Sequence, residues 1–143
     1  MADPNKTLPG NVAGDFFVDD TCIDCDLCRQ IAPASFAADR ESSIVYHQPE
    51  TNEQIHDARK ALLTCPTGSI GTHQKPDLGE ALRAYPDPIH ENVFFCGYSS
   101  RNSFGGSSYL VVRQEGNVLV DSPRFARQLV RRLEDMGGIS KMF

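Results

Sequence analysis

Short runs of alternating apolar and polar residues predict that the first half of the chain contains brief strands and one amphipathic helix. Two strands are expected at residues 15–19 and 42–47, where aromatic and β-branched residues lie between turn-forming residues. The helix is expected to begin at Thr51, which opens a capping-box motif. It should end at Cys65, because the proline that follows cannot continue a helix. A third short strand is expected at residues 67–70.

After about residue 75 the pattern changes to apolar strands separated by a loop rich in serine and glycine. Asp77 is placed to cap a brief helix within a connector. The elements expected beyond it are a strand at 93–97, a hairpin of strands at 109–113 and 118–121, a helix at 124–136 and a further apolar segment from 139. The side chains expected to face inward from this helix are Phe125, Leu129, Val130, Leu133 and Met136.

These elements predict an α+β fold in two parts. The 143 residues suit one domain, or a small domain with an appendage. The expected divisions are a flexible tail at 1–14, a first domain at 15–75, a connector at 76–90 and a second segment at 91–143. The tail is expected to be flexible because its residues are mostly polar and include two prolines.

Composition limits where the protein is expected to work. Hydrophobic residues make up 40% of the chain, but no apolar run approaches the roughly 18 residues of a membrane helix. The N-terminus lacks the basic and apolar regions of a secretory signal, and it contains Asp3, a residue type that transit peptides usually avoid. We therefore expect a protein that crosses no membrane and works in the cytoplasm, or in the plastid stroma if the source is eukaryotic.

The net charge of −5 is unevenly spread, with 13 acidic and 7 basic side chains in residues 1–85. Five aspartates surround a run of cysteines and are opposed there only by Arg29; they are Asp15, Asp19, Asp20, Asp24 and Asp26. Such a field repels nucleic acid and attracts basic surfaces, at rates that fall as salt rises. The two interpretations are a solvated acidic face and a docking site for a basic partner.

Four of the five cysteines have the spacing of ligands to an iron–sulfur cluster. Cys22, Cys25 and Cys28 fill the first three positions of the bacterial ferredoxin motif C-x2-C-x2-C-x3-C-P, and Ala32 takes the fourth. In two-cluster proteins that fourth cysteine serves the other cluster, so the partner of these three is sought elsewhere. Cys65 is the one cysteine followed by proline, and it completes the set.

The ligands of a second cluster are all missing. Counting back from Cys65 by the same motif places them at Ile55, Ala58 and Ala61, in addition to Ala32. The first three of these residues lie on the apolar face of the expected helix. One set of ligands is therefore complete, and the other has been lost as a group.

A 4Fe–4S cluster is the cofactor that this set of thiolates is expected to bind. A 3Fe–4S cluster is the nearest alternative, but such sites often lack a usable second cysteine, and Cys25 is present. A zinc site usually draws on two separated C-x2-C pairs, which three cysteines within seven residues do not form. Cys96 lies in an apolar strand and is expected to be a buried, inert thiol.

Residues 15–72 resemble the single-cluster ferredoxins of the bacterial type. Besides the cysteines, Pro33, Phe36 and the sequence CPTGSI at 65–70 match the pattern of that family. The resemblance implies a ferredoxin-like βαβ-βαβ fold with pseudo-two-fold symmetry around one cluster. It also implies that the protein transfers single electrons, with the cluster carrying the redox change and no residue acting as a catalyst.

Residues 93–143 resemble the first part of the metallo-β-lactamase fold. The matches are SYLVV at 108–112, NVLVDSP at 117–123 and the order of strands and helix. Proteins that join such a domain to a single-cluster ferredoxin occur in oxygenic phototrophs, and the chain is similar to their first half. The resemblance implies that Asp121 ends a strand before the first long helix, and that the motif H-x-H-x-D-H would lie beyond Phe143.

The second resemblance leads to an alternative function. The chain would then be the N-terminal part of a larger metallo-hydrolase or oxidoreductase, and the cluster would supply electrons to it or sense redox state. The strand edges left unpaired in residues 91–143 are also a liability that a homodimer would cover.

Overall fold

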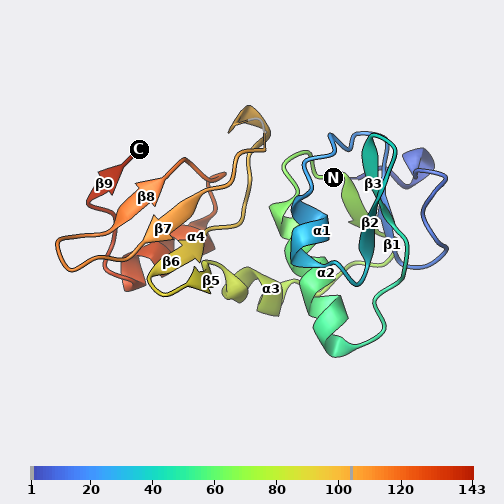
Figure 1. Cartoon of the computed structure of the whole chain (residues 1–143). Coiled ribbons are helices and arrows are strands. Elements are labelled where there is room, and N and C mark those ends of the chain that lie inside the picture. The colour runs from blue at the N-terminus through green and yellow to red at the C-terminus, as the bar shows by residue number, and fades with distance from the viewer. Residues whose placement is uncertain (1, 104) are drawn as a thin grey trace. The chain divides into compact units, whose positions relative to one another are not determined.

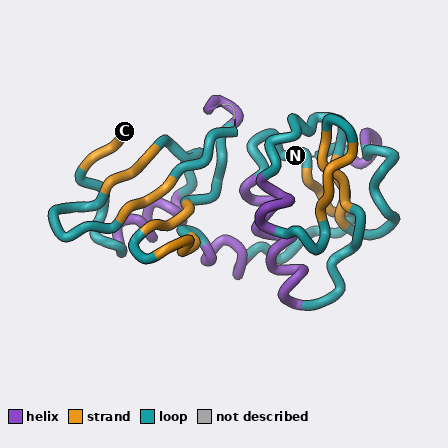
Figure 2. The backbone as a smooth tube through the Cα atoms, in the orientation of Figure 1, coloured by secondary structure: helices purple, strands orange, loops and turns teal. Residues whose placement is uncertain are grey.

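The computed structural model describes residues 2–103 and 105–143, and the chain divides into two compact units, Met1–Ala81 and Leu82–Phe143. Each unit contains both helices and strands, so the protein is of the mixed α/β type (Figure 1). The strands are short, and loops join most of the elements (Figure 2). In the part of the chain that the structure describes, no helix is both long and apolar enough to cross a membrane.

The first unit is built from two short antiparallel sheets and two packed helices. Strand β1 pairs with β4, β2 pairs with β3, and α1 packs against α2 (Figure 1). The elements in chain order are a 3-10 helix η1 (Pro4–Lys6), β1 (Phe16–Val18), α1 (Leu27–Ile31), β2 (Phe36–Asp39), β3 (Ser42–Val45), α2 (Asn52–Thr64) and β4 (Ile70–Thr72).

Helix α2 begins and ends where its local sequence predicts. The Thr51 hydroxyl accepts a hydrogen bond from the Gln54 backbone N–H, and the Gln54 side chain accepts one from the Thr51 backbone N–H, both at 3.2 Å. This capping box satisfies two N–H groups in the N-terminal region of the helix. Cys65 forms the C-terminal cap, and Pro66 turns the chain towards β4.

The core of the first unit contains several positions at which the sequence motif would place ligands of a second cluster. Ala32, Ala58 and Ala61, three of the positions where that cluster would have ligands, are 3%, 0% and 1% exposed. They belong to one apolar cluster with Phe36 and Val45. Small side chains let α1 and α2 approach each other closely, and apolar packing therefore fills this part of the domain.

Residues 2–14 differ from the flexible tail that we expected, because they are tied to the sheets by backbone and side-chain hydrogen bonds. The Leu8 N–H donates to the Val18 carbonyl at 2.9 Å. The Asn11 amide group donates to the carbonyls of Leu8 and Val18, both at 2.8 Å. Its oxygen accepts from the N–H groups of Val18 and Val45, at 3.2 and 2.9 Å. Polar composition suggested disorder here, but one asparagine supplies the partners that the neighbouring strands need.

The second unit is a five-stranded sheet with the strand order β5-β6-β7-β8-β9. All neighbouring strands are antiparallel except β8 and β9, which are parallel and are connected through α4. The elements are β5 (Asp87–His90), β6 (Val93–Phe95), a 3-10 helix η2 (Arg101–Ser103), β7 (Tyr109–Val111), β8 (Val118–Val120), α4 (Arg127–Asp135) and β9 (Lys141–Met142). Helix α3 (Gly79–Ala84) lies at the boundary between the units, and Asp77 caps it by accepting from the Gly79 N–H at 2.9 Å.

Several details differ from the sequence-based predictions. Strand β5 lies inside the expected connector, and α1 and β2 were not anticipated. In α4, Leu129 and Leu133 are buried as predicted, but Phe125 is 78% exposed and Val130 is 37% exposed. The helix begins only at Arg127, so Phe125 precedes its first turn, and Val130 follows Leu129 by one residue and is rotated away from the sheet.

Candidate metal centre

Four cysteines from three parts of the first unit line a single small pocket, which we call the cysteine pocket. Its lining residues are Cys22, Cys25, Cys28 and Cys65, with Val18, Ile23, Leu27, Ser43, Thr67, Ser69 and Ile70. The structure therefore brings together all four cysteines that sequence spacing singled out, and it surrounds them mainly with apolar side chains.

The backbone sets the position of each cysteine. Positive φ angles of 54° at Asp24 and 68° at Asp26 curl the loop between the first and third cysteines. Cys28 lies in the first turn of α1, and Cys65 caps the end of α2. These three structural features bring the four cysteines to one pocket.

Two backbone N–H groups point at the sulfur atoms. The Ser43 N–H donates to Cys22 Sγ at 3.4 Å, and the Ser69 N–H donates to Cys65 Sγ at 3.3 Å. One comes from β3 and the other from the turn before β4. Such hydrogen bonds stabilise negative charge on sulfur and contribute to the potential of an iron–sulfur site.

The pocket is a poor place for thiolates without a cation. Burial raises the pKa of Cys28 to about 11, and the three other pocket cysteines add to the rise, although the Ser43 side chain opposes it. Burial also raises the pKa of Cys25, with further contributions from Cys65 and Cys22. Metal ions reverse this balance, because a coordinated thiol loses its proton outright. The donor set therefore fits a cationic metal centre that is bound by thiolates.

Among the described residues, no group of three or more histidine, cysteine, aspartate or glutamate side chains was found that could hold a single metal ion. The four cysteines nevertheless line one pocket. Four cysteine thiolates are the ligand set of a 4Fe–4S cluster.

Much of the acidic charge in the cysteine loop is paired. The Arg29 Nη1 atom lies 2.6 Å from Asp24 Oδ1, and its Nε donates to Asp26 Oδ1. Hydrogen bonds from Gln30 and Arg29 lower the pKa of Asp26. Arg29 therefore holds the loop together, whereas the nearby Asp20 is exposed to solvent.

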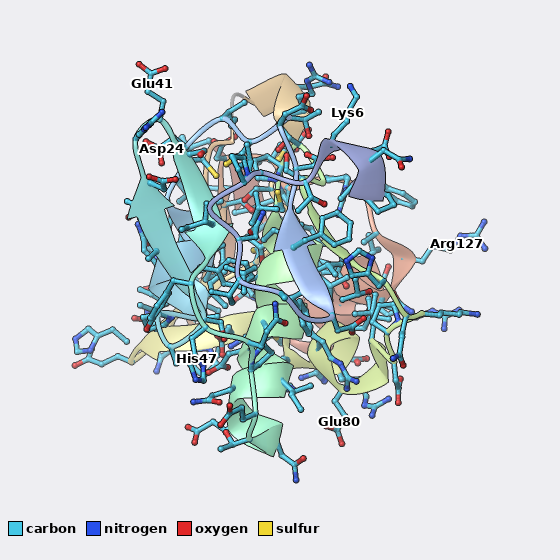
Figure 3. The ribbon with its side chains drawn as sticks, turned by 90° about the vertical axis from the view of Figure 1, so that its right-hand side faces the viewer. Lys6, Asp24, Glu41, His47, Glu80 and Arg127 are labelled. Carbon is cyan, nitrogen blue, oxygen red and sulfur yellow. The ribbon has the colours of Figure 1, made fainter. Side chains whose placement is uncertain are left out.

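Cys22 also lines a second, open depression on the surface. The acidic residues around that depression are Asp20, Asp39 and Glu41, and Arg40 lies among them. We call these residues the acidic rim. Glu41, in the turn between β2 and β3, points away from the ribbon (Figure 3). The cysteine pocket thus reaches solvent beside a surface with more negative than positive charge.

Asp19 is a buried carboxylate that no sequence pattern singled out beyond its charge. It is 2% exposed, and both of its oxygens accept hydrogen bonds. The Asp3 N–H donates to Oδ2 at 2.8 Å, and Oδ1 accepts from the N–H and the hydroxyl of Thr21, at 3.0 and 2.5 Å. Burial acts to raise the pKa of Asp19, but the bonds from Thr21 and Asp3 outweigh it, and the pKa is lowered.

A line of hydroxyl groups continues from Thr21 to a pocket cysteine. Thr21 Oγ1 lies 2.7 Å from Ser69 Oγ, which lies 2.6 Å from Thr67 Oγ1. Thr67 Oγ1 in turn lies 3.6 Å from Cys65 Sγ. These residues come from both ends of the domain sequence, so no local sequence signal could have linked them.

Cys96 does not line the cysteine pocket and belongs to the second unit. It is 0% exposed, as predicted for a buried thiol, and burial raises its pKa to about 11.

Comparisons with known proteins match the first unit. Residues 18–72 match the family described as "4Fe-4S single cluster domain of Ferredoxin I". Over 60 residues the chain is 37% identical to Ferredoxin-1 of Desulfocurvibacter africanus, and the match covers 41% of this chain and 92% of that protein. No solved structure matched the chain.

Proposed function

Because the chain belongs to the family of single-cluster 4Fe–4S ferredoxins and binds one 4Fe–4S cluster, we propose that the four cysteines of the cysteine pocket are the ligands of that cluster. The ferredoxin domain is an electron carrier, and the protein would exchange single electrons with redox partners. The observation that supports the ligand assignment most directly is the convergence of these four thiols on one mainly apolar pocket.

The bound cluster supplies the one-electron redox change, and the chain supplies its surroundings. The N–H groups of Ser43 and Ser69 donate to sulfur and stabilise its negative charge. The apolar wall, which includes Val18, Leu27 and Ile70, keeps bulk water from the ligands. Cys22, which lines both the pocket and the acidic rim, is the ligand through which the electron would leave.

Anaerobic reconstitution tests this assignment. The protein should hold about four irons and four sulfides, show broad brown absorption and give an EPR signal when reduced. Cys65→Ser should weaken or convert the cluster, whereas Cys96→Ser should leave iron content and spectrum unchanged. A colourless protein with bound zinc, or a cluster that needs Cys96, would contradict the proposal.

We further propose that the redox partner has a basic docking face. The acidic rim lies beside Cys22, so a basic surface bound there would come close to the cluster ligand. Glu41→Lys should then slow electron exchange with a basic partner and reduce its salt dependence. The matched control is Glu80→Lys, which makes the same charge change on α3, at the opposite end of the view in Figure 3. Equal effects of the two substitutions would show that only net charge matters.

A second candidate function comes from residues 82–143. Their order of four strands, helix and parallel strand, with Asp121 directly after β8, supports the proposal that they belong to a metallo-β-lactamase-like domain. The cluster would then serve a metallo-hydrolase or oxidoreductase. The reading frame downstream of Phe143 decides between this candidate function and that of an independent electron carrier. A metallo-β-lactamase-like enzyme requires an H-x-H-x-D-H motif there.

We also propose that two copies associate through the second unit. Strand β9 is an edge strand; its residue Met142 is 63% exposed, and Phe143, which follows it, is 79% exposed. Apolar residues on an open strand edge favour pairing with another chain. Sedimentation should show a dimer that Met142→Lys dissociates; a monomer at all concentrations would contradict this.

A further inference from the structure

The line of hydroxyl groups between Asp19 and Cys65 has a direction that can be worked out by counting hydrogens. It contains three hydroxyls, those of Thr21, Ser69 and Thr67, and each carries one hydrogen. The line also contains three oxygen–oxygen contacts, of 2.5, 2.7 and 2.6 Å, the first of them to the carboxylate. Contacts this short each need a hydrogen between the oxygens.

Asp19 supplies none of these hydrogens, because an ionised carboxylate only accepts. Thr21 must therefore donate to Asp19, Ser69 to Thr21, and Thr67 to Ser69. All three hydrogens are used between oxygens. The contact of 3.6 Å between Thr67 Oγ1 and Cys65 Sγ is then left without a hydroxyl hydrogen.

We propose that Asp19 is a positioning residue that turns the hydroxyl hydrogens of this line away from the cluster, so that Cys65 Sγ faces an oxygen lone pair of Thr67. This inference rests on the proposed function, since it requires Cys65 to be a cluster ligand. The only hydrogen-bond donor to Cys65 Sγ from this turn is then the Ser69 backbone N–H, at 3.3 Å.

The cluster should therefore have a lower reduction potential than it would have if the Thr67 hydroxyl donated to Cys65 Sγ. A hydrogen bond to a ligand sulfur stabilises the extra negative charge of the reduced cluster, and an oxygen lone pair does not. The line thus keeps the Thr67 hydroxyl from donating to Cys65 Sγ. Cutting it between Asp19 and Thr67 should free the Thr67 hydrogen to turn towards Cys65 Sγ.

Ser69→Ala is the direct test, because it removes the acceptor of the Thr67 hydroxyl and leaves every charge in place. The reduction potential should rise by about 59 mV. This corresponds to an approximately tenfold change in the equilibrium constant for transfer of one electron from a fixed partner. Thr67→Val alone should change that equilibrium by less than about twofold. The double variant should resemble Thr67→Val, because it lacks the hydroxyl that causes the rise.

Three further variants test the role of Asp19 and the specificity of the effect. Thr21→Val cuts the line one step from the carboxylate and should also raise the potential, while Thr21→Ser keeps the hydroxyl and should not. Ser35→Ala is the matched control, since Ser35 is also 1% exposed or less but does not line the cysteine pocket. In resonance Raman spectra, an iron–cysteine vibration should shift in frequency when the protein is moved into deuterated water. This shift should be larger in Ser69→Ala than in the wild type.

The outcomes separate this inference from the proposed function. All comparisons use proteins that contain about four irons and four sulfides; a wild type that binds no cluster refutes the proposed function. If the variants carry the cluster and Thr67→Val lowers the potential, Thr67 donates to Cys65 and the inference is wrong. It is also wrong if Ser69→Ala has no effect, or if its effect persists in the double variant. A rise in Ser69→Ala without one in Thr21→Val would overturn the role given to Asp19.

Discussion

Replacing Asn11 with alanine is expected to destabilise the first unit strongly, although Asn11 lies in a segment that looks like a tail in the sequence. Its side chain makes four hydrogen bonds to backbone groups, two as donor and two as acceptor. These bonds join the N-terminal segment to β1 and β3. The substitution would remove all four and leave the N–H groups of Val18 and Val45 without that partner.

The expected loss of folding free energy in Asn11→Ala follows from the number of hydrogen bonds removed and from how buried they are. A hydrogen bond of this kind contributes about 0.5–1.5 kcal/mol, so four contribute about 2–6 kcal/mol. Asn11 is only partly buried, and water can replace some of the lost partners, which brings the expected loss to about 3 kcal/mol. With a urea dependence of about 1–3 kcal/mol per molar, the unfolding midpoint should fall by about 1–3 M.

Anaerobic urea titration of the cluster-loaded protein, followed by cluster absorption and circular dichroism, measures this shift. Asn5→Ala is the matched control, because Asn5 lies in the same segment and its hydrogen bonds run only to Asp3. That variant should stay within about 0.5 kcal/mol of the wild type. If Asn11→Ala unfolds at the same urea concentration as Asn5→Ala, the segment is not part of the folded domain and the reasoning fails.

Three other predictions concern stability and reactivity. Thr51→Ala should remove the capping box of α2 and cost about 1 kcal/mol in the same titration; no change would mean that the cap does not stabilise α2. Cys96 should resist iodoacetamide in the native protein at about pH 8, since a pKa of about 11 leaves about one thiol in a thousand ionised. Rapid labelling would show that Cys96 is accessible. Leu129→Ala should cost about 2–5 kcal/mol and Phe125→Ala less than about 0.5 kcal/mol, because only Leu129 is buried; similar losses would contradict the observed helix start.

The sequence predicts well those features that depend on local spacing. The capping box at Thr51 and the hairpin of β7 and β8 lie where their motifs indicate. The four cysteines meet at one pocket because the motif is a spacing rule for a loop and a helix end. Phe125 was misplaced because helical periodicity does not fix where the first turn begins, and an apolar residue just before a helix can satisfy the same pattern.

The sequence does not predict contacts between distant polar residues. Thr21 and Ser69 have no shared motif, and they meet only because pairing of β1 with β4 brings their segments together. Asn11 is likewise a common residue in a polar segment, and its role depends on free backbone groups of two strands. Burial of Asp19 depends on both the N-terminal segment and the cysteine loop, which sequence patterns treat as separate.

The alanines at the positions where the motif would place ligands of a second cluster bear on the stoichiometry of the proposed electron exchange. Ala32, Ala58 and Ala61 pack into the apolar core of the first unit, and the domain binds one 4Fe–4S cluster. In the proposed function, each encounter with a partner would then move a single electron. A partner enzyme that needs an electron pair would have to store the first electron until a second reduced copy arrives.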